Sequence, residues 1–240
     1  INSEAAICKK IDRFGNKESI FEKEADKGLP IASLTKLMTS IIILENYNLN
    51  EEVIVSPTAA NQQNAYWGGN LVAGEKRTIG ELFELMLIFS SNDAAYSIAE
   101  QIGLKNFTQK MNQKAQELNL ENTHFINSSG LDPVTDEIPN YSTTEDLVKI
   151  TEYVLKNHPS VFQTSLKSID HKLNASLSSL VLKQKQRLIG GKTGFTFKAG
   201  GCLLTVLEND KNETFINIVL GTKSYNERIE EMQKIINIIQ

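Results

Sequence analysis

The sequence has few of the residues that cross-link small domains or bind metals in them. It contains two cysteines and three histidines in 240 residues, and no Cys-x-x-Cys pair, which excludes a thioredoxin motif or a zinc knuckle. Cys8 and Cys202 stand near opposite ends of the chain, and we expect two free, buried thiols. A chain of this length can bury roughly 70–75% of its unfolded surface, so it can fold without disulfides or metals.

Long apolar runs and an excess of basic charge are also missing. The longest strictly apolar runs are 41–44 and 85–89, whereas a membrane-spanning helix needs about 20 such residues. No membrane association is therefore visible in the chain. The 25 basic and 29 acidic side chains give a net charge of −4, which argues against nucleic acid as a partner.

Two common catalytic motifs are incomplete or absent. The Gly-Lys-Thr triplet at 191–193 matches the end of a phosphate-binding loop, but the first glycine of that motif would be residue 186, a glutamine. No Gly-x-Ser-x-Gly elbow occurs. His124, His158 and His171 have no partner at metal-ligand spacing, so we expect structural or surface histidines. A serine enzyme built on this chain would use a base other than histidine.

The pattern that is present is strand-rich at both ends. Loose alternation and turn residues predict strands over 4–12, 18–24, 195–207 and 214–220. A terminal amphipathic helix is predicted over 224–239. Its polar face, which includes Glu227, Arg228 and Lys234, carries both signs of charge, so we expect the helix to pack on the sheet and not on a membrane.

The middle of the chain is predicted to be helical. Apolar residues over 33–45 recur at the spacing of a helix. Further along the chain, capping residues mark the starts of four more predicted helices. The expected N-terminal caps are Thr78, Asn92, Asn106 and Ser142. A helical insert between strand-rich ends implies one domain, 1–240, with a sheet lobe (about 1–50 and 165–240) and a helical lobe (about 51–164). The cleft between the lobes is the expected site.

A lysine stands one turn after a serine at the start of the first predicted helix. Ser33 and Lys36 are at positions i and i+3, which share a helix face, so the amine can reach the hydroxyl. A serine hydroxyl becomes a strong nucleophile when a base takes its proton. A lysine can be that base if burial or a nearby cation keeps it neutral. No other Ser-x-x-Lys occurs in the sequence.

Two further triplets carry compatible chemistry. Ser90-Ser91-Asn92 falls in the short break between two predicted helices, whereas a second Ser-x-Asn at 224–226 has no such context. Lys192-Thr193-Gly194 is placed at the opening of a predicted strand. A lysine and a threonine hydroxyl can hold a carboxylate, and a glycine lets a ligand approach the backbone.

The three motifs together carry a resemblance. Ser-x-x-Lys, Ser-x-Asn and Lys-Thr-Gly, in this order, mark class A β-lactamases and penicillin-binding proteins. With these motifs and the longer stretches 30–39, 90–95, 111–131, 141–147 and 190–204, the chain resembles the low-molecular-mass penicillin-binding proteins, the serine D-alanyl-D-alanine carboxypeptidases. The resemblance implies an α+β fold of the β-lactamase/transpeptidase type. An antiparallel sheet would be flanked by N- and C-terminal helices, with an inserted all-helical lobe.

The resemblance also implies a role for each motif residue. Ser33 would attack the carbonyl between two D-alanines and form an acyl-enzyme, with Lys36 as base. Ser90 would pass a proton to the departing D-alanine. The backbone N–H groups of Ser33 and Phe195 would form the oxyanion hole, in which each donor is worth on the order of 3–4 kcal/mol.

The remaining motif residues would bind substrate. By the same resemblance, Asn92 would hold the substrate amide, and Lys192 and Thr193 the terminal carboxylate, beside Gly194. The implied partners are peptidoglycan stem peptides ending in D-Ala-D-Ala and β-lactam antibiotics, with no metal or organic cofactor. The implied location is extracytoplasmic, after export by a signal peptide not present in this chain.

Departures from the family pattern leave alternatives open. Ser91 stands where the family usually has glycine, and we expect the small side chain to be tolerated; 160–189 matches least well. A class A β-lactamase would need a glutamate at the position of Ala115, so slow release of penicillin is expected. Endopeptidase activity on cross-links uses the same machinery, and an inert wall-binding module is the weakest alternative.

Overall fold

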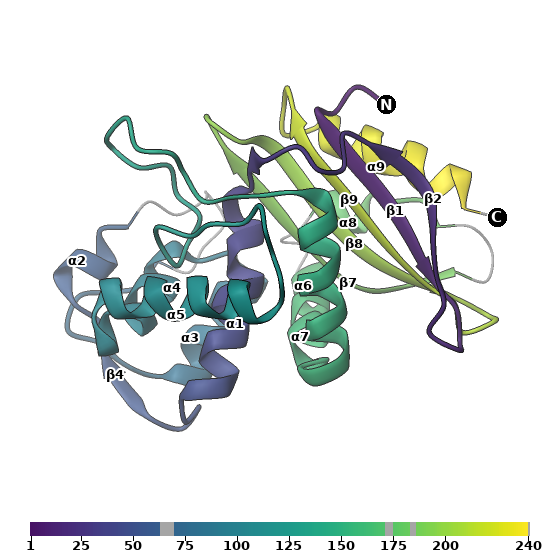
Figure 1. Cartoon of the computed structure of the whole chain (residues 1–240). Coiled ribbons are helices and arrows are strands. Elements are labelled where there is room, and N and C mark those ends of the chain that lie inside the picture. Colours follow the sequence, from purple (N-terminus) through teal and green to yellow (C-terminus); the bar gives the residue numbers. More distant parts are fainter. Residues whose placement is uncertain (63–69, 171–174, 183–185, 240) are drawn as a thin grey trace.

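The computed structural model describes residues 1–62, 70–170, 175–182 and 186–239. A five-stranded antiparallel sheet forms one side of the molecule, and most helices gather on the other (Figure 1). In space the strands follow the order β2-β1-β9-β8-β7. Their bounds are β1 Ala5–Ile11, β2 Lys17–Lys23, β7 Gln186–Thr196, β8 Gly200–Asn209 and β9 Thr214–Thr222.

The two ends of the chain meet inside this sheet. β1 pairs antiparallel with β9, with Ala5 opposite Leu220. The turn before β2 is closed by Asp12, whose carboxylate accepts the backbone N–H groups of Phe14 and Asn16. The strand-rich ends predicted from the sequence therefore form one sheet and not two.

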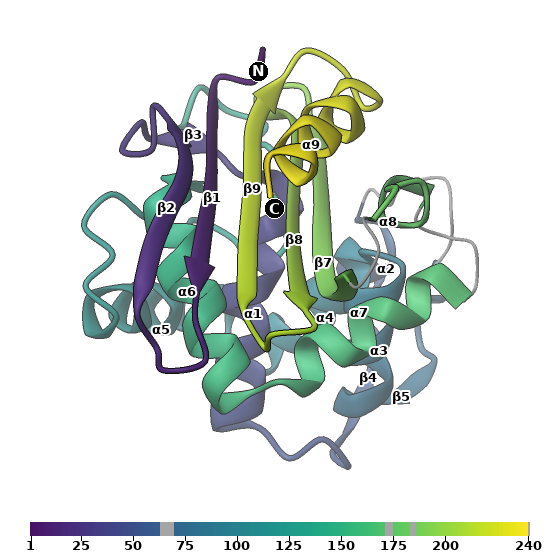
Figure 2. The same cartoon turned by 90° about the vertical axis from the view of Figure 1, so that its right-hand side faces the viewer.

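Helices cover both faces of the sheet. α9 (Glu227–Ile238) lies across β8 and β9 on one face (Figure 2) and buries Met232, Ile235 and Ile236 against it. The other face packs on α6 and α7. α8 lies on the same face as α9, since its Leu177 belongs to the same buried cluster as Met232. The bounds of these and the remaining helices are α1 Thr35–Asn46, α2 Pro57–Ala60, α3 Ile79–Ile88, α4 Asn92–Ala99, α5 Leu104–Glu117, α6 Thr144–Asn157, α7 Ser160–Asp170 and α8 Ala175–Ser178.

Short elements link the helices. The 3₁₀ turns are Ala32–Leu34 and Glu100–Ile102. Two-stranded pairs join β3 (Leu29–Pro30) to β6 (Tyr141–Ser142) and β4 (Glu52–Ile54) to β5 (Lys76–Thr78). In the part of the chain that the structure describes, no helix is both long and apolar enough to span a bilayer.

The predicted helix caps are confirmed at one position and shifted at the others. Thr78 and Glu81 form the expected capping box of α3. The cap of α4 is Ser91 and not Asn92, since the Ser91 hydroxyl accepts the N–H of Ala94.

The third and fourth caps move in the same way. α5 begins at Leu104 after Gly103, and the Asn106 side chain instead donates to the carbonyl of Ile102. Thr143, not Ser142, caps α6. Neighbouring Ser, Thr and Asn residues are all competent caps, so local sequence leaves a choice that tertiary packing makes.

The strand predicted over 195–207 is wrong in its limits. β7 begins at Gln186, and a turn at 197–199 separates it from β8. The turn is closed by Thr196, whose hydroxyl accepts the N–H of Ala199, and by Gly200 at φ = +63°. Lys192 therefore lies inside β7, an edge strand of the sheet, and not at its start.

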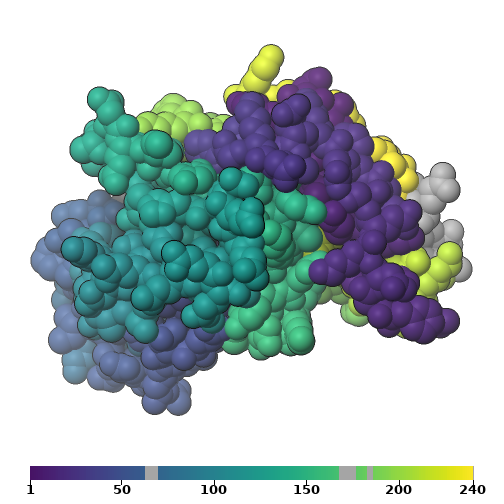
Figure 3. Space-filling view, viewed as in Figure 1, coloured from purple at the N-terminus to yellow at the C-terminus, as the bar shows by residue number. Residues whose placement is uncertain are grey.

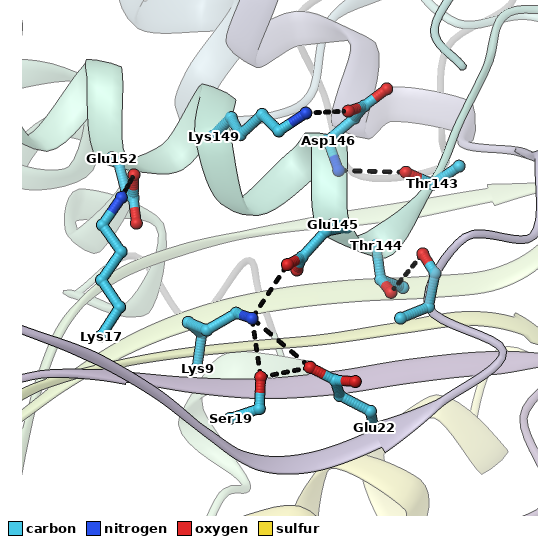
Figure 4. Close-up of polar contacts among 11 residues, drawn as sticks. Lys9, Lys17, Ser19, Glu22, Thr143, Thr144, Glu145, Asp146, Lys149 and Glu152 are labelled. Carbon is cyan, nitrogen blue, oxygen red and sulfur yellow. Dashed lines mark hydrogen bonds and ion pairs between the residues drawn. The ribbon is translucent and has the colours of Figure 1, made fainter. Parts of the chain in front are cut away.

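Ion pairs tie α6 to the first two strands (Figure 4). The Lys9 amine lies 2.9 Å from the carboxylate of Glu145 and 3.4 Å from that of Glu22, and Lys17 pairs with Glu152 at 2.5 Å. Each surface ion pair alone contributes little to stability, but together these pairs fasten α6 to the sheet.

The histidines and cysteines lie apart from any reactive cluster. His124 pairs with Tyr141 through the backbone, and His158 ends α6; His171 lies outside the described residues. Among the described residues, no group of three His, Cys, Asp or Glu side chains is placed to hold a metal ion. Cys8 and Cys202 are free and buried, as expected, and burial raises the pKa of each thiol to about 12.

Close packing of α7 on β7 gives a test of the fold. A Cβ added at Gly190 would lie 2.5 Å from the Cβ of Phe162, so we expect Gly190→Ala to lower the free energy of unfolding by about 1–3 kcal/mol. At Gly28 the nearest atom to an added Cβ is 3.8 Å away, and Gly28→Ala should change stability by less than about 0.5 kcal/mol. Urea unfolding measures both, and equal stability of the two variants would contradict this packing.

Candidate active site

Ser33 and Lys36 meet where the chain enters α1. Ser33 lies in the 3₁₀ turn that precedes the helix, and Lys36 is in its first turn with no exposed surface. The Lys36 Nζ atom is 2.9 Å from the Ser33 Oγ atom. The contact expected from their spacing is therefore present.

Two fixed acceptors orient the Lys36 amine. Its Nζ donates to the Oδ1 of Asn92 at 2.7 Å and to the carbonyl of Ser129 at 2.6 Å. A neutral amine has two N–H groups and one lone pair. With both N–H groups held by these acceptors, the lone pair faces the Ser33 hydroxyl, which is the geometry that a general base needs.

Electrostatics favours the neutral form of Lys36. Burial, followed by the positive charge of Lys192, holds the pKa of Lys36 well below its usual value, while the carboxylate of Asp93 acts in the opposite direction. Desolvation and like charge both disfavour an ammonium ion. The site therefore supplies the condition under which lysine can accept a proton near neutral pH.

A second serine–lysine pair, Ser90 and Lys192, lines the same cavity as Ser33. The Lys192 Nζ on β7 donates to the Oγ of Ser90 at 2.7 Å and to the carbonyl of Thr193 at 3.0 Å. Burial and then the charge of Arg228 lower the pKa of Lys192 to about 7. Ser90 sits between α3 and α4 at φ = +56°, a region that non-glycine residues rarely occupy.

Ser91 has a structural role that glycine could not supply. Its side chain is fully buried, caps α4 and hydrogen-bonds the carboxylate of Asp93. The other oxygen of Asp93 accepts the N–H of Leu71 at 2.8 Å. These bonds fix the start of α4, which carries Asn92 toward Lys36.

Two glycines let neighbouring segments close on the 3₁₀ turn that carries Ser33. A Cβ at Gly194 would lie 3.0 Å from the backbone N of Ser33, and one at Gly130 would lie 1.9 Å from the carbonyl oxygen of Ala32. Gly130 also has φ = +86°. Only glycine allows β7 and the loop 127–131 to approach this closely.

The loop 127–131 is itself held by buried amides. Asn140 donates to the Oγ1 of Thr35 at 3.0 Å and accepts the N–H of Asn127 at 3.2 Å. The Asn127 Oδ1 in turn accepts the N–H of Gly130 at 2.7 Å. This network places the carbonyl of Ser129 against Lys36.

One cavity of about 1000 Å³ unites the predicted residues. It is lined by Ser33, Ser90, Asn92, Lys192, Thr193, Gly194 and Phe195. Lys36 has no exposed surface and lies behind this lining, in contact with Ser33 and Asn92. The structure thus brings all eight predicted site residues together.

Sequence reasoning missed several residues that shape this site. Ser129 and Gly130 lie in the stretch 111–131 and Asp93 lies in the stretch 90–95, which support the resemblance without assigning these residues a role. Arg228 was expected on the polar face of the terminal helix, which is wrong. It is 1% exposed and donates to the carbonyl of Gly194 at 2.7 Å, because the start of α9 lies over the end of β7.

The repulsion between Arg228 and Lys192 is testable by titration. Arg228→Gln removes a nearby positive charge, so the pKa of Lys192 should rise above about 7. Arg187→Gln is the matched control, because Arg187 is exposed at the other end of β7 and pairs with Glu208 at 2.7 Å. NMR of ¹³Cε-labelled lysine follows the titration, and a Lys192 pKa that stays unchanged in Arg228→Gln would contradict the repulsion.

The amino-acid sequence is similar to those of known peptidases. Residues 2–224 match the family model described as D-alanyl-D-alanine carboxypeptidase. A D-alanyl-D-alanine carboxypeptidase of Bacillus subtilis is 30% identical over 91% of this chain and 58% of its own length. A D-alanyl-D-alanine endopeptidase of Haemophilus influenzae is 31% identical over 85% of this chain and 72% of its own. The chain thus spans little more than half the length of the Bacillus relative.

A solved structure extends the match to the fold. Penicillin-binding protein D2 of Listeria monocytogenes, in its cefotaxime-bound form, superposes with a TM-score of 0.76 at 28% identity, covering 98% of this chain and 96% of the other. The α+β fold of the transpeptidase type expected from the sequence is thereby confirmed. The C-terminal helix α9 flanks the sheet as expected, whereas the first element of the described residues is strand β1 and not the expected N-terminal helix. From these matches the chain belongs to the serine-type D-alanyl-D-alanine carboxypeptidase family, peptidase S11, of low-molecular-mass penicillin-binding proteins.

Proposed function

We propose that this protein is a serine D-alanyl-D-alanine carboxypeptidase that trims the terminal D-alanine from peptidoglycan stem peptides outside the cytoplasmic membrane. The observation that carries the proposal is the 2.9 Å contact of the buried Lys36 amine with the Ser33 hydroxyl inside the cavity. The family match supports this chemistry and the cell wall as the place of action.

Acylation begins at Ser33. Lys36 takes the hydroxyl proton as the Ser33 Oγ attacks the carbonyl between the two D-alanines. The backbone N–H groups of Ser33 and Phe195 donate hydrogen bonds to the carbonyl oxygen as negative charge develops on it. The close approach of β7 to the turn that carries Ser33, seen at Gly194, supports an oxyanion hole formed by both segments.

The second pair assists the leaving group. Ser90, hydrogen-bonded to Lys192, relays the proton that Lys36 took from Ser33 to the departing D-alanine nitrogen, which leaves Lys36 neutral again. Lys192 and Thr193 hold the terminal carboxylate in a charge-assisted contact. Asn92 turns its Oδ1 toward Lys36, so its amide N–H is the end that donates to the substrate carbonyl. Water then cleaves the ester and restores Ser33.

Release of a penicilloyl group should be slow. The position at which class A β-lactamases would carry their deacylating glutamate is Ala115, which is 2% exposed in the core side of α5. An alanine cannot activate water. The protein is therefore proposed as a target of β-lactams and not as an enzyme that destroys them.

Covalent labelling tests the nucleophile. Benzylpenicillin should add one equivalent to the native protein by intact-mass spectrometry and none to Ser33→Ala. Ser224→Ala, in the other Ser-x-Asn triplet, should still add one equivalent, since Ser224 lies outside the residues that line the cavity. Absence of an adduct on the native protein would remove the basis for a serine acyl-enzyme.

The substrate test compares two peptides. We expect release of D-alanine from a pentapeptide ending in D-Ala-D-Ala to exceed cleavage of a cross-linked peptide dimer, because Lys192 and Thr193 favour a free terminal carboxylate. The 31% identity to the Haemophilus endopeptidase makes endopeptidase activity the second candidate. Faster cleavage of the dimer would establish that second activity, and steady nitrocefin hydrolysis at many turnovers per second would indicate a β-lactamase.

A further inference from the structure

Asn140 is a buried polar residue that lies close to the Ser33–Lys36 pair but outside the lining of the cavity. Residues 134–138, which precede it, are exposed and project from the surface (Figure 3), whereas the chain turns inward at Pro139. Asn140 is 1% exposed. An amide is buried at little cost only where hydrogen bonds satisfy it, so the partners of Asn140 show what it holds together.

The backbone of Asn140 is paired with the segment that leads to Ser33. β3 and β6 pair antiparallel, and one residue beyond this pair the carbonyl of Asn140 accepts the N–H of Ile31 at 3.2 Å. Ile31 directly precedes the 3₁₀ turn Ala32–Leu34. The backbone of Asn140 is therefore in fixed register with the turn that carries the proposed nucleophile.

The side chain of Asn140 holds the loop that reaches Lys36. Residues 125–131 lie outside the helices and strands of the described chain, so their backbone groups need other partners. The Oδ1 of Asn140 accepts the N–H of Ile126 at 2.7 Å and that of Asn127 at 3.2 Å. Its Nδ2 donates to the carbonyl of Asn127 at 2.9 Å. One amide thus binds three backbone groups of this loop.

The same amide also binds the first turn of α1. The Nδ2 of Asn140 donates to the Oγ1 of Thr35 at 3.0 Å. Thr35 is fully buried and directly precedes Lys36 in the sequence. The loop on the other side of Asn140 provides the Ser129 carbonyl that accepts from the Lys36 amine. Asn140 therefore joins the segment that carries the amine to the segment that carries one of its acceptors.

The position of the Ser129 carbonyl determines where the Lys36 lone pair points. The two N–H groups of the neutral amine donate to Ser129 and Asn92. The lone pair then faces the Ser33 hydroxyl, 2.9 Å away. If the loop shifted by about 1 Å, one N–H would lose its acceptor and the amine would rotate. A misplacement of this size costs up to about 100-fold in rate, and it leaves the groups on β7 that are proposed to bind substrate unchanged.

We propose that Asn140 is a positioning residue for acylation, which keeps the loop 127–131 in register with the start of α1 so that Lys36 stays aligned as the base for Ser33. This inference rests on the proposed acyl-enzyme chemistry. It differs from a contribution to stability alone, because it predicts slower acylation by correctly folded molecules. Noncovalent binding in the cavity should remain as it is.

Stopped-flow acylation by nitrocefin separates binding from acylation. The dependence of the observed rate on nitrocefin concentration gives the dissociation constant of the noncovalent complex and the acylation rate constant. Asn140→Ala should lower the acylation rate constant by about 10- to 100-fold and leave the dissociation constant within about twofold. After long incubation with benzylpenicillin, intact-mass spectrometry should still show one equivalent bound, which confirms that the variant is folded.

Asn112→Ala is the matched control. The amide of Asn112 holds the other end of the same loop in a similar way, since its Oδ1 accepts the N–H of Phe125 at 2.9 Å and its Nδ2 donates to the carbonyl of Phe125 at 2.8 Å. Phe125 is four residues from Ser129, and Asn140 still holds the loop between them. Asn112→Ala should therefore leave both constants within about twofold.

A second variant decides the question if Asn140→Ala does not fold. Thr35→Val keeps the shape of the side chain and removes the hydroxyl to which Asn140 donates. Loss of one hydrogen bond of this kind should lower the acylation rate constant by about fivefold. An unchanged acylation rate constant in Thr35→Val would then overturn the positioning role.

The outcomes separate this inference from the function on which it rests. An acylation rate constant in Asn140→Ala equal to that of the native protein, or lowered no more than in Asn112→Ala, would overturn the positioning role. A change confined to the dissociation constant or to the labelled fraction would do the same, and the proposed acyl-enzyme would stand in each case. Absence of any adduct on the native protein would instead remove the proposed function, and the role of Asn140 with it.

Discussion

The burial of two lysine amines in one small volume is the constraint on which the rest of the site depends. An ammonium ion taken out of water loses several kcal/mol of hydration, and two such ions also repel. Lys36 and Lys192 respond with lowered pKa values, and each amine finds acceptors in other elements. Lys36 needs Asn92 from α4 and Ser129 from the loop 127–131. Satisfying two amines therefore forces a helix, a loop and an edge strand to meet at one point.

The close packing of these three elements explains why unusual backbone conformations occur around the two lysines. Ala32, which precedes Ser33, and Ser90, itself a proposed catalytic residue, both have positive φ, as few non-glycine residues do. Such conformations cost of order 1–3 kcal/mol each and persist only where the surroundings hold them. Here the loop 127–131 and strand β7 pack directly against the Ala32–Ser33 backbone. Gly130 and Gly194 make this packing possible, because a Cβ at either position would be too close to that backbone.

The sequence predicts features that depend on local geometry. The Ser33–Lys36 contact follows from helical spacing, and the Thr78 capping box from four consecutive residues. The cap of α4 was misplaced, since neighbouring residues there are equally competent caps. The β7–β8 turn was missed, because it depends on a distant contact of Thr196 with Asp132. Arg228 shows the limit most clearly. Helical periodicity assigns it to a polar face, and only the tertiary structure, in which its side chain reaches the carbonyl of Gly194 in β7, shows that this part of the face is buried.

Arg228 also shows that the site extends beyond its three motifs. Its guanidinium holds the carbonyl of Gly194, between the proposed carboxylate-binding pair and the proposed oxyanion donor at Phe195. It lowers the pKa of Lys192, whose charge in turn lowers that of Lys36. A protein with a net charge of −4 thus concentrates three basic side chains, Lys36, Lys192 and Arg228, around one cavity. The same guanidinium lies over the ring of Tyr225, which also lines the cavity. One residue of the terminal helix therefore links the electrostatics around Ser33 to the aromatic lining of the cavity.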